Sequence, residues 1–385
     1  SLVPIFLLVH LQRHGHRPVA LVGGATGMIG DPTGKSAERN LLDEETLEKY
    51  VNGIKAQLAR FLDFDGRNGN SAILVNNYDW MKDFSFIDFV RNVGKHLTVN
   101  YMMAKDSVKS RLSAESNVGM SFTEFTYQLI QGYDYLYLYE KLGVKLQMGG
   151  SDQWGNITTG TELIRRTIQG EAFAFTCPLT TKADGTKFGK SEGGENIWLD
   201  KKRTSPYKFY QFWLNQADAD CEKYIKIYTF LDKETIDDLI EHHRKEPHLR
   251  ELQRKLATEI TIMVHGVDEL HKAEKASQML FGKSTSEDLK SLDTDTFLSV
   301  FEGVPQAIIT KEDLENGLAI VDVLVEKSGF LKSNSEARRE LAANAISVNK
   351  EKITDEFILD TSHLINDKYV LLQKGKKNYF ILLVE

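Results

Sequence analysis

Cysteine is scarce in this sequence, which has only Cys177 and Cys221 among its 385 residues. Two thiols cannot form a disulfide framework, and their spacing matches no metal-binding motif, so we predict a protein of the reducing cytoplasm without a metal site. Long apolar runs are missing too. The apolar start at residues 2–9 is too short to span a bilayer and follows no basic stretch. We therefore predict no signal peptide, no transmembrane helix and no membrane partner.

An excess of positive charge is also absent. Lys and Arg number 48 against 55 Asp and Glu, which gives a formal net charge of -7. This balance argues against a protein that coats nucleic acid without specificity, but it leaves room for a local basic surface that meets a structured RNA. The hydrophobic content of 41% and the charged content of 27% are typical of a globular protein, and the length predicts two or three domains.

Short apolar runs alternate with helical patterns over the first two hundred residues. The runs cover residues 19–22, 72–75, 145–148 and 174–178, and the clearest helical pattern covers residues 44–62. Short buried strands that alternate with helices predict an α/β fold with a parallel sheet. Glycine pairs and polar residues follow these strands, where ligands bind in such sheets.

The pattern changes from about Ser205. Residues 206–215, 221–231, 233–245 and 249–265 have helical periodicity, so we predict an α-helical domain over 205–283. Residues 284–317 are interpreted as a connecting segment. A small α+β module is predicted over 318–385, with the N-cap cluster Ser333-Asn334-Ser335 before a helix and strands at 346–348, 369–372 and 379–383.

The stretch from Gly23 to Ser36 is rich in glycine and follows the first predicted strand. It is not a P-loop, because Ile29 stands where the motif needs its first glycine, and the glycines also miss the dinucleotide-binding offsets. A tight backbone remains, with one carboxylate, Asp31. Two interpretations stay open: Asp31 meets a ligand, or it caps the turn before Pro32.

Tyr127, Gln131 and Asp134 fall at positions i, i+4 and i+7 of a predicted helix. This spacing puts three hydrogen-bonding side chains on one face, where a solvated face would carry Lys and Glu. The face either lines a small polar pocket or belongs to a partly buried helix whose polar groups are satisfied.

The run Gly149-Gly150-Ser151-Asp152-Gln153-Trp154-Gly155-Asn156 follows another strand and leads into a helix that we expect to begin at Ile157. The glycines allow a ligand to approach the backbone, and a carboxylate at a strand end can accept hydrogen bonds from ribose hydroxyls. The alternative is that Ser151 or Asp152 only caps the helix.

Lys187-Phe188-Gly189-Lys190-Ser191 places two lysines three residues apart between glycines. Such a loop can close on a polyphosphate and stabilise the charge that develops in a transition state. A solvated, flexible hairpin tip is the alternative interpretation.

Taken in this order, these four segments resemble those of bacterial tyrosyl-tRNA synthetases, a class I aminoacyl-tRNA synthetase family, and the resemblance extends from Leu2 to the C-terminus. It implies a Rossmann-like catalytic domain over 1–204 with an insert at about 84–125, an anticodon-side helical domain and an S4-like RNA-binding module. It also implies a tyrosine–tRNA ligase with L-tyrosine, ATP and tRNA(Tyr) as partners, Mg²⁺ accompanying ATP, and no tightly bound cofactor.

The resemblance further implies roles for single residues. Asp31 would pair with the substrate ammonium and Asp134 with its phenol. The remaining tyrosine-pocket residues would be Thr26, Tyr127, Gln131 and Gln147. ATP would be bound by Gly150, Asp152, Gln153 and Lys190. Lys187, Lys190 and Ser191 would stabilise the charge of pyrophosphate during catalysis, and Lys35 and Arg39 would contact phosphate or tRNA.

Three further expectations accompany the resemblance. The family carries a preceding segment with a His-x-Gly-His motif that this sequence lacks, so we expect the chain as written to form tyrosyl-adenylate poorly or not at all. The family is usually homodimeric, and Phe84, Phe86, Phe89 and Val90 are either an apolar interface or part of the core. A synthetase-derived RNA-binding protein without catalysis and a tryptophanyl-type enzyme remain as alternatives.

Overall fold

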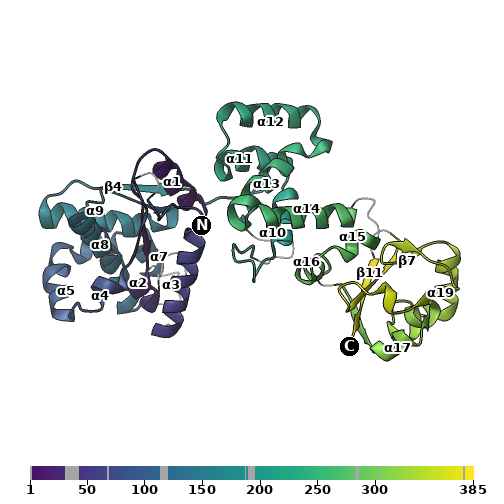
Figure 1. Cartoon of the computed structure of the whole chain (residues 1–385). Coiled ribbons are helices and arrows are strands. Elements are labelled where there is room, and N and C mark those ends of the chain that lie inside the picture. The colour runs from purple at the N-terminus through teal and green to yellow at the C-terminus, as the bar shows by residue number, and fades with distance from the viewer. Residues whose placement is uncertain are drawn as a thin grey trace. The chain divides into compact units, whose positions relative to one another are not determined.

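The computed structural model describes residues 2–30, 43–66, 69–112, 120–186, 188–189, 196–281, 286–302, 304–375 and 378–385 (Figure 1). The chain divides into two compact units. The first comprises Ser1–Phe188 together with Lys223–Leu231, and the second comprises Gly189–Glu222 and Asp232–Glu385. Each unit has its own core and is described by itself.

The first unit is an α/β structure with parallel strands, as predicted. Strands β1 (Val19–Val22) and β2 (Ile73–Asn76) pair in parallel, and so do β3 (Leu146–Gly150) and β4 (Phe173–Cys177). Within the described residues these are two separate two-stranded sheets, not one continuous sheet, because no hydrogen-bonded ladder joins β1 to β3. The helices are α1 (Leu2–Arg13), α2 (Gly24–Ile29), α3 (Glu44–Leu58), α4 (Tyr78–Met81), α5 (Phe86–Asn92), α6 (Val99–Met103), α7 (Asp106–Leu112), α8 (Phe122–Leu142) and α9 (Trp154–Ile168).

Helix α8 is the 21-residue element that carries the Tyr127 to Asp134 face. It begins with a capping box, in which Ser121 accepts from the backbone of Glu124 while the Glu124 side chain accepts from the backbone of Ser121. It ends at Gly143, whose φ of 67° is the left-handed conformation that glycine adopts most readily. The two caps therefore fix where α8 begins and ends, with the polar face between them.

Helices α8 and α9 pack closely against each other, as the teal elements of Figure 1 show. A Cβ atom on Gly160 of α9 would lie 2.7 Å from the Cβ of Tyr135 on α8, so only glycine permits this approach. Tyr135 is fully buried, and its hydroxyl lies 2.8 Å from the carbonyl oxygens of both Lys145 and Phe173, beside β3 and β4, so that its one proton bonds one or shares both. The helix pair is thereby anchored to one of the two sheets.

The beginning of α9 differs from our prediction. A 3₁₀ turn covers Ser151–Gln153, α9 begins at Trp154, and neither Ser151 nor Asp152 supplies a side-chain cap. The expected start at Ile157 and the capping role of these two side chains are therefore wrong. The physical reason is that the helix extends one turn toward β3, which leaves Asp152 on the turn at the strand end.

The second unit begins with helices α10 (Pro206–Leu214), α12 (Lys233–Lys245), α13 (Glu251–His265) and α14 (Val267–Phe281), and with the first residues of α11 (Asp218–Tyr228). Ser205 caps α10 by accepting from the backbone of Lys208, and Pro206 occupies its first position. Trp213, Leu252 and Ile260 are each at most 1% exposed, so the helical patterns predicted from about Ser205 do form a packed core.

A five-stranded sheet in the order β5-β11-β10-β7-β8 follows in the same unit. Its strands are β5 (Gln306–Ile309), β7 (Ile346–Val348), β8 (Glu351–Lys352), β10 (Tyr369–Lys374) and β11 (Asn378–Val384), all antiparallel except the parallel pair β5 and β11. The shorter elements are α15 (Ser286–Lys290), α16 (Thr294–Val300), α17 (Lys311–Glu315), β6 (Leu318–Ala319), α18 (Ile320–Asp322) with a following π-helical turn (Val323–Lys327), α19 (Asn334–Ala342) and β9 (Ile358–Leu359). Ser333 caps α19, as predicted.

Candidate functional site

The face of α8 that carries Tyr127, Gln131 and Asp134 points into the first unit. Tyr127 is 8% exposed, Gln131 is half-buried, and Asp134 is completely buried at 0%. A solvated face is therefore excluded. On this face Oε1 of Gln131 is buried without a hydrogen-bond partner among the described residues, so its polar groups are not all satisfied within the protein.

Two side chains that the sequence did not single out hold the carboxylate of Asp134. Asn77 donates from Nδ2 to Oδ2 over 2.9 Å, and Trp80 donates from Nε1 to Oδ1 over 2.9 Å. Burial raises the pKa of Asp134 to about 7, while the two hydrogen bonds act in the opposite direction. The site thus contains a carboxylate that titrates near neutral pH and is already oriented by two donors.

Asn77 also links Asp134 to the glycine-rich segment after β1. Its Nδ2 donates to Oγ1 of Thr26 over 3.1 Å, and its Oδ1 accepts from the backbone N–H of Ala25 over 2.7 Å. The side chain is fully buried. The predicted pocket residue Thr26 therefore lies one hydrogen bond from the Asp134 network. The signal for Asn77 was present in the sequence as a polar doublet, Asn76-Asn77, at the end of a strand.

A second chain of hydrogen bonds joins α8 to the turn after β3. Gln131 donates from Nε2 to Oε1 of Gln153 over 3.1 Å, and Gln153 donates from Nε2 to Oδ2 of Asp152 over 3.0 Å. A Cβ atom on Gly150 would lie 2.4 Å from Oδ1 of Asp152, so the carboxylate lies directly over the strand end. Two motifs that were separate in sequence therefore form one site.

Two buried acceptors among the predicted pocket residues have no hydrogen-bond partner within the described part of the chain. They are Oε1 of Gln131 and Oε1 of Gln147, the latter on β3. An unpaired buried polar group costs about 1–3 kcal/mol, so such atoms are retained where a ligand satisfies them. Both are acceptors, so any group that paired with them would have to donate hydrogen bonds.

Six predicted site residues lie outside the described residues. They are Asp31, Lys35, Arg39, Lys187, Lys190 and Ser191. Their roles stay predictions. Of the lysine motif, Phe188 and Gly189 are described, and Phe188 packs against aromatic side chains of the first unit.

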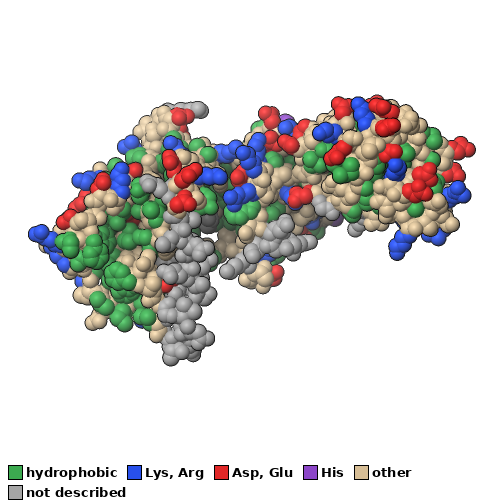
Figure 2. All heavy atoms as spheres, turned by 90° about the horizontal axis from the view of Figure 1, so that it is seen from below, with side chains coloured by type: hydrophobic (Ala, Val, Ile, Leu, Met, Phe, Trp, Pro, Cys, Tyr) green, Lys and Arg blue, Asp and Glu red, His purple; other side chains and the backbone are tan. Residues whose placement is uncertain are grey.

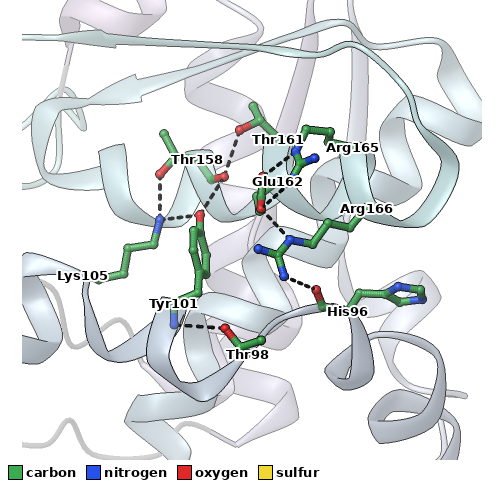
Figure 3. Close-up of polar contacts among 9 residues, drawn as sticks. All are labelled: His96, Thr98, Tyr101, Lys105, Thr158, Thr161, Glu162, Arg165 and Arg166. Carbon is green, nitrogen blue, oxygen red and sulfur yellow. Dashed lines mark hydrogen bonds and ion pairs between the residues drawn. The ribbon is translucent and has the colours of Figure 1, made fainter.

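A polar cluster beside this site fastens α6 to α9 (Figure 3). Nζ of Lys105 donates to the hydroxyl of Tyr101 over 2.8 Å and to Oγ1 of Thr158 over 3.0 Å, and burial lowers the pKa of Lys105. Further along α9, hydrogen bonds from Arg165 and Arg166 hold the pKa of Glu162 at about 2, although burial opposes this. The cluster stabilises α9, which begins within the Gly149 to Asn156 run.

The described residues hold neither a metal-binding cluster nor a membrane-spanning helix. They contain no group of three or more His, Cys, Asp or Glu side chains that could hold a metal ion. None of the described helices is long and apolar enough to cross a membrane.

Comparison with known proteins identifies this architecture. A family model described as "tRNA synthetases class I (W and Y)" matches residues 1–282, and one described as "Tyrosine--tRNA ligase SYY-like C-terminal domain" matches residues 296–382. The fold is that of a class I synthetase, with a Rossmann-like catalytic domain, helical regions and a C-terminal sheet module. The chain belongs to the class I tRNA synthetase family that acts on tryptophan and tyrosine.

Several tyrosine–tRNA ligases and tyrosyl-tRNA synthetases are similar to this chain. The tyrosine–tRNA ligase of Flavobacterium psychrophilum is 69% identical over 100% of this chain and 89% of its own length, and that of Parabacteroides distasonis is 61% identical over the same shares. Among solved structures, the mitochondrial tyrosyl-tRNA synthetase of Coccidioides posadasii is 31% identical with a TM-score of 0.61, covering 71% of this chain and 78% of that chain. That of Aspergillus nidulans is 30% identical with a TM-score of 0.62, covering 72% and 81%.

Proposed function

We propose that this chain is a tyrosine–tRNA ligase, which activates L-tyrosine with ATP and transfers the tyrosyl group to tRNA(Tyr). The observation that carries the proposal is the buried Asp134 carboxylate, oriented by Asn77 and Trp80 at one end of the α8 pocket face. A phenol O–H is the donor that such an acceptor fits, and phenylalanine would bring no further donor to the buried carboxylate.

The other groups of the site suit the rest of the substrates. The unpaired oxygens of Gln131 and Gln147 suit the substrate ammonium, together with Tyr127 and Asp31. Asp152, with Gly150 below it, suits the ribose of ATP, supported by Gln153. Lys187, Lys190 and Ser191 stabilise the charge on pyrophosphate as the tyrosine carboxylate attacks the α-phosphate, and Lys35 and Arg39 contact phosphate or tRNA. Mg²⁺ arrives with ATP, bound to its phosphates.

ATP–pyrophosphate exchange tests this proposal. With tyrosine as substrate, exchange is expected with a kcat/KM at least about a hundredfold above that for phenylalanine, since one hydrogen bond to a buried charge is lost. Tryptophan should not support exchange, because relatives that are 61–69% identical are tyrosine–tRNA ligases. Preferred use of tryptophan would contradict the choice of substrate, and RNA binding without any exchange would favour the non-catalytic alternative.

The preceding segment expected from the family has a separate test. The same exchange assay compares this 385-residue chain with a version that carries the His-x-Gly-His segment of a relative at its start. A kcat for the chain alone within about tenfold of the extended version would show that the segment is dispensable for adenylate formation.

We also propose a homodimer through the first unit. Phe84 and Phe89 pack in the core with Tyr133, but Phe86, Ile87 and Val90 of α5 are exposed, as is Phe122 at the start of α8. Figure 2 shows hydrophobic side chains gathered on the face of the first unit that this view presents. Such a surface supports association, because a monomer rarely exposes several large apolar side chains together. Sedimentation of the chain and of a Phe122→Asp variant tests it, with dissociation of the variant expected.

The proposed function also includes tRNA as a partner and the cytoplasm as the location. The C-terminal sheet module supports binding of tRNA, because it matches the family's C-terminal domain over residues 296–382. A cytoplasmic location is supported by the two cysteines, which are both free and buried.

A further inference from the structure

The lysine-containing motif is preceded by a hairpin whose base is described. The backbone N–H of Phe188 donates to the carbonyl of Thr180 over 3.4 Å, and that of Lys182 donates to the carbonyl of Thr186 over 2.9 Å. Asp184 closes the tip by accepting from the backbone and the hydroxyl of Thr186. The hairpin therefore delivers Phe188 to a defined place, with Lys187 before it and Lys190 two residues after it.

Two tyrosines of the segment Lys223–Leu231 meet this hairpin. The ring of Phe188 lies 4.5 Å from the ring of Tyr224 and stacks on that of Tyr228 at 5.8 Å with an interplanar angle of 24°. The two tyrosines are 0% and 2% exposed, whereas Phe188 is half-buried. The ring contacts are within the range of favourable aromatic pairs.

The hydroxyls of the same tyrosines hold the base of the hairpin. Tyr228 donates to Oγ1 of Thr180 over 3.0 Å, and Tyr224 donates to the carbonyl of Thr181 over 3.2 Å. Each tyrosine thus contacts the hairpin twice, once through its ring at Phe188 and once through its oxygen at the other strand. This double contact restrains the position of Phe188 and the direction of the backbone at the end of the hairpin.

The segment Lys223–Leu231 is itself fastened to α1. Phe6 of α1 meets Tyr228 edge-on at 5.8 Å and stacks on Phe230 at 5.0 Å, and the guanidinium of Arg13 lies 3.8 Å above the Phe230 ring. All these residues belong to the first unit. The two tyrosines therefore connect the hairpin to a packed part of the first unit.

We propose that Tyr224 and Tyr228 are positioning residues for tyrosine activation, because they hold Phe188, a described residue of the lysine-containing motif whose proposed role is to stabilise pyrophosphate. The inference rests on the proposed function, since it assigns the lysines of this motif to pyrophosphate. A displacement of about 1 Å in a group that stabilises a transition state is enough to lower kcat strongly. Because tyrosine binds elsewhere in the site, its affinity does not depend on these rings.

The test measures ATP–pyrophosphate exchange for Phe188→Leu, Tyr224→Leu and the double variant, in the protein that shows exchange activity. Each single variant is expected to lower kcat about tenfold, with the KM for tyrosine within about twofold of the parent. The double variant is expected to lose less than the product of the two single effects, since both substitutions remove the Phe188–Tyr224 contact. Tyr228→Phe, which keeps the ring, should retain kcat within about threefold.

Phe230→Leu is the matched control. It lies in the same segment and packs on α1, so it should lower the melting temperature while kcat stays within about twofold of the parent. Limited digestion with trypsin gives a second readout: cleavage after Lys187 and Lys190 should be faster in Tyr224→Leu and unchanged in Phe230→Leu.

Lys190→Ala separates the inference from the proposed function. An unchanged kcat in Lys190→Ala would remove the lysine motif from catalysis and would overturn both. A large fall in Lys190→Ala with unchanged kcat in Tyr224→Leu and Phe188→Leu would overturn the positioning role alone. Equal losses of kcat, tyrosine affinity and melting temperature in Tyr224→Leu would also overturn it, because they would indicate a purely structural role.

Discussion

Nε1 of Trp80 donates a hydrogen bond to Oδ1 of Asp134 over 2.9 Å, across 54 residues of sequence. The other oxygen of the same carboxylate accepts from Asn77. Donors of this kind stabilise the ionised form, whereas complete burial destabilises it and raises the pKa to about 7. The two donors therefore decide how much of the carboxylate is charged, and able to accept from a phenol, at neutral pH.

Trp80→Phe is expected to weaken tyrosine binding in a pH-dependent way. The substitution removes one donor but keeps the ring that stacks on Tyr137 at 4.4 Å, so the pKa of Asp134 rises further. The KM for tyrosine should increase about tenfold at pH 7, and the increase should shrink toward pH 9, where the carboxylate ionises again. Trp198→Phe, at an exposed tryptophan, is the control and should leave the pH profile of KM in place.

Asp134→Asn is expected to raise the KM for tyrosine about a hundredfold and to leave the KM for ATP within about twofold. It should also change the pH dependence of stability. Because the pKa of Asp134 is raised from 3.8 to about 7, the folded chain binds more protons than the unfolded chain between these values, and its stability falls as pH rises through that window. The variant lacks this pH-dependent loss of stability. The melting temperature of the variant minus that of the parent should therefore rise between pH 4 and pH 7.

Gly160→Ala is expected to lower the free energy of unfolding by about 1–3 kcal/mol, because the added Cβ would lie 2.7 Å from the Cβ of Tyr135. Gly53→Ala is the matched control in the interior of α3, where nothing lies within 4 Å of the added carbon. That change should raise stability by about 0.5–1 kcal/mol. Thermal unfolding of both variants checks the pair, and equal effects would contradict close packing of α8 on α9.

Glu162→Gln is expected to destabilise the first unit at neutral pH only. The hydrogen bonds from Arg165 and Arg166 lower the pKa of Glu162 to about 2, so its contribution is present above the ordinary value of 4.5 and is lost as pH falls toward 2. Both arginines are partly exposed, so the loss at pH 7 should be about 1 kcal/mol. Melting curves of parent and variant should converge near pH 2, and a difference that persists there would contradict the ion pairs as its cause.

Most regular elements of the catalytic unit could be predicted because their signals are local. Strand β1 has its predicted bounds at Val19–Val22, and β2 is shifted by one residue. Strand β5 was missed, since Gln306–Ile309 lies in the segment interpreted as a connection. Its conformation depends on pairing with β11, far along the chain, and no local pattern carries that information.

The candidate site was likewise predicted only in part from the sequence. The helical period alone aligned Tyr127, Gln131 and Asp134 on one face, because residues four and seven apart on a helix are neighbours whatever surrounds them. The helical period could not predict that Asp134 is fully buried, or that Asn77 and Trp80 donate hydrogen bonds to it. Those facts arise where β2, α4 and α8 meet, and only long-range packing decides which donors reach a carboxylate and how far its pKa moves.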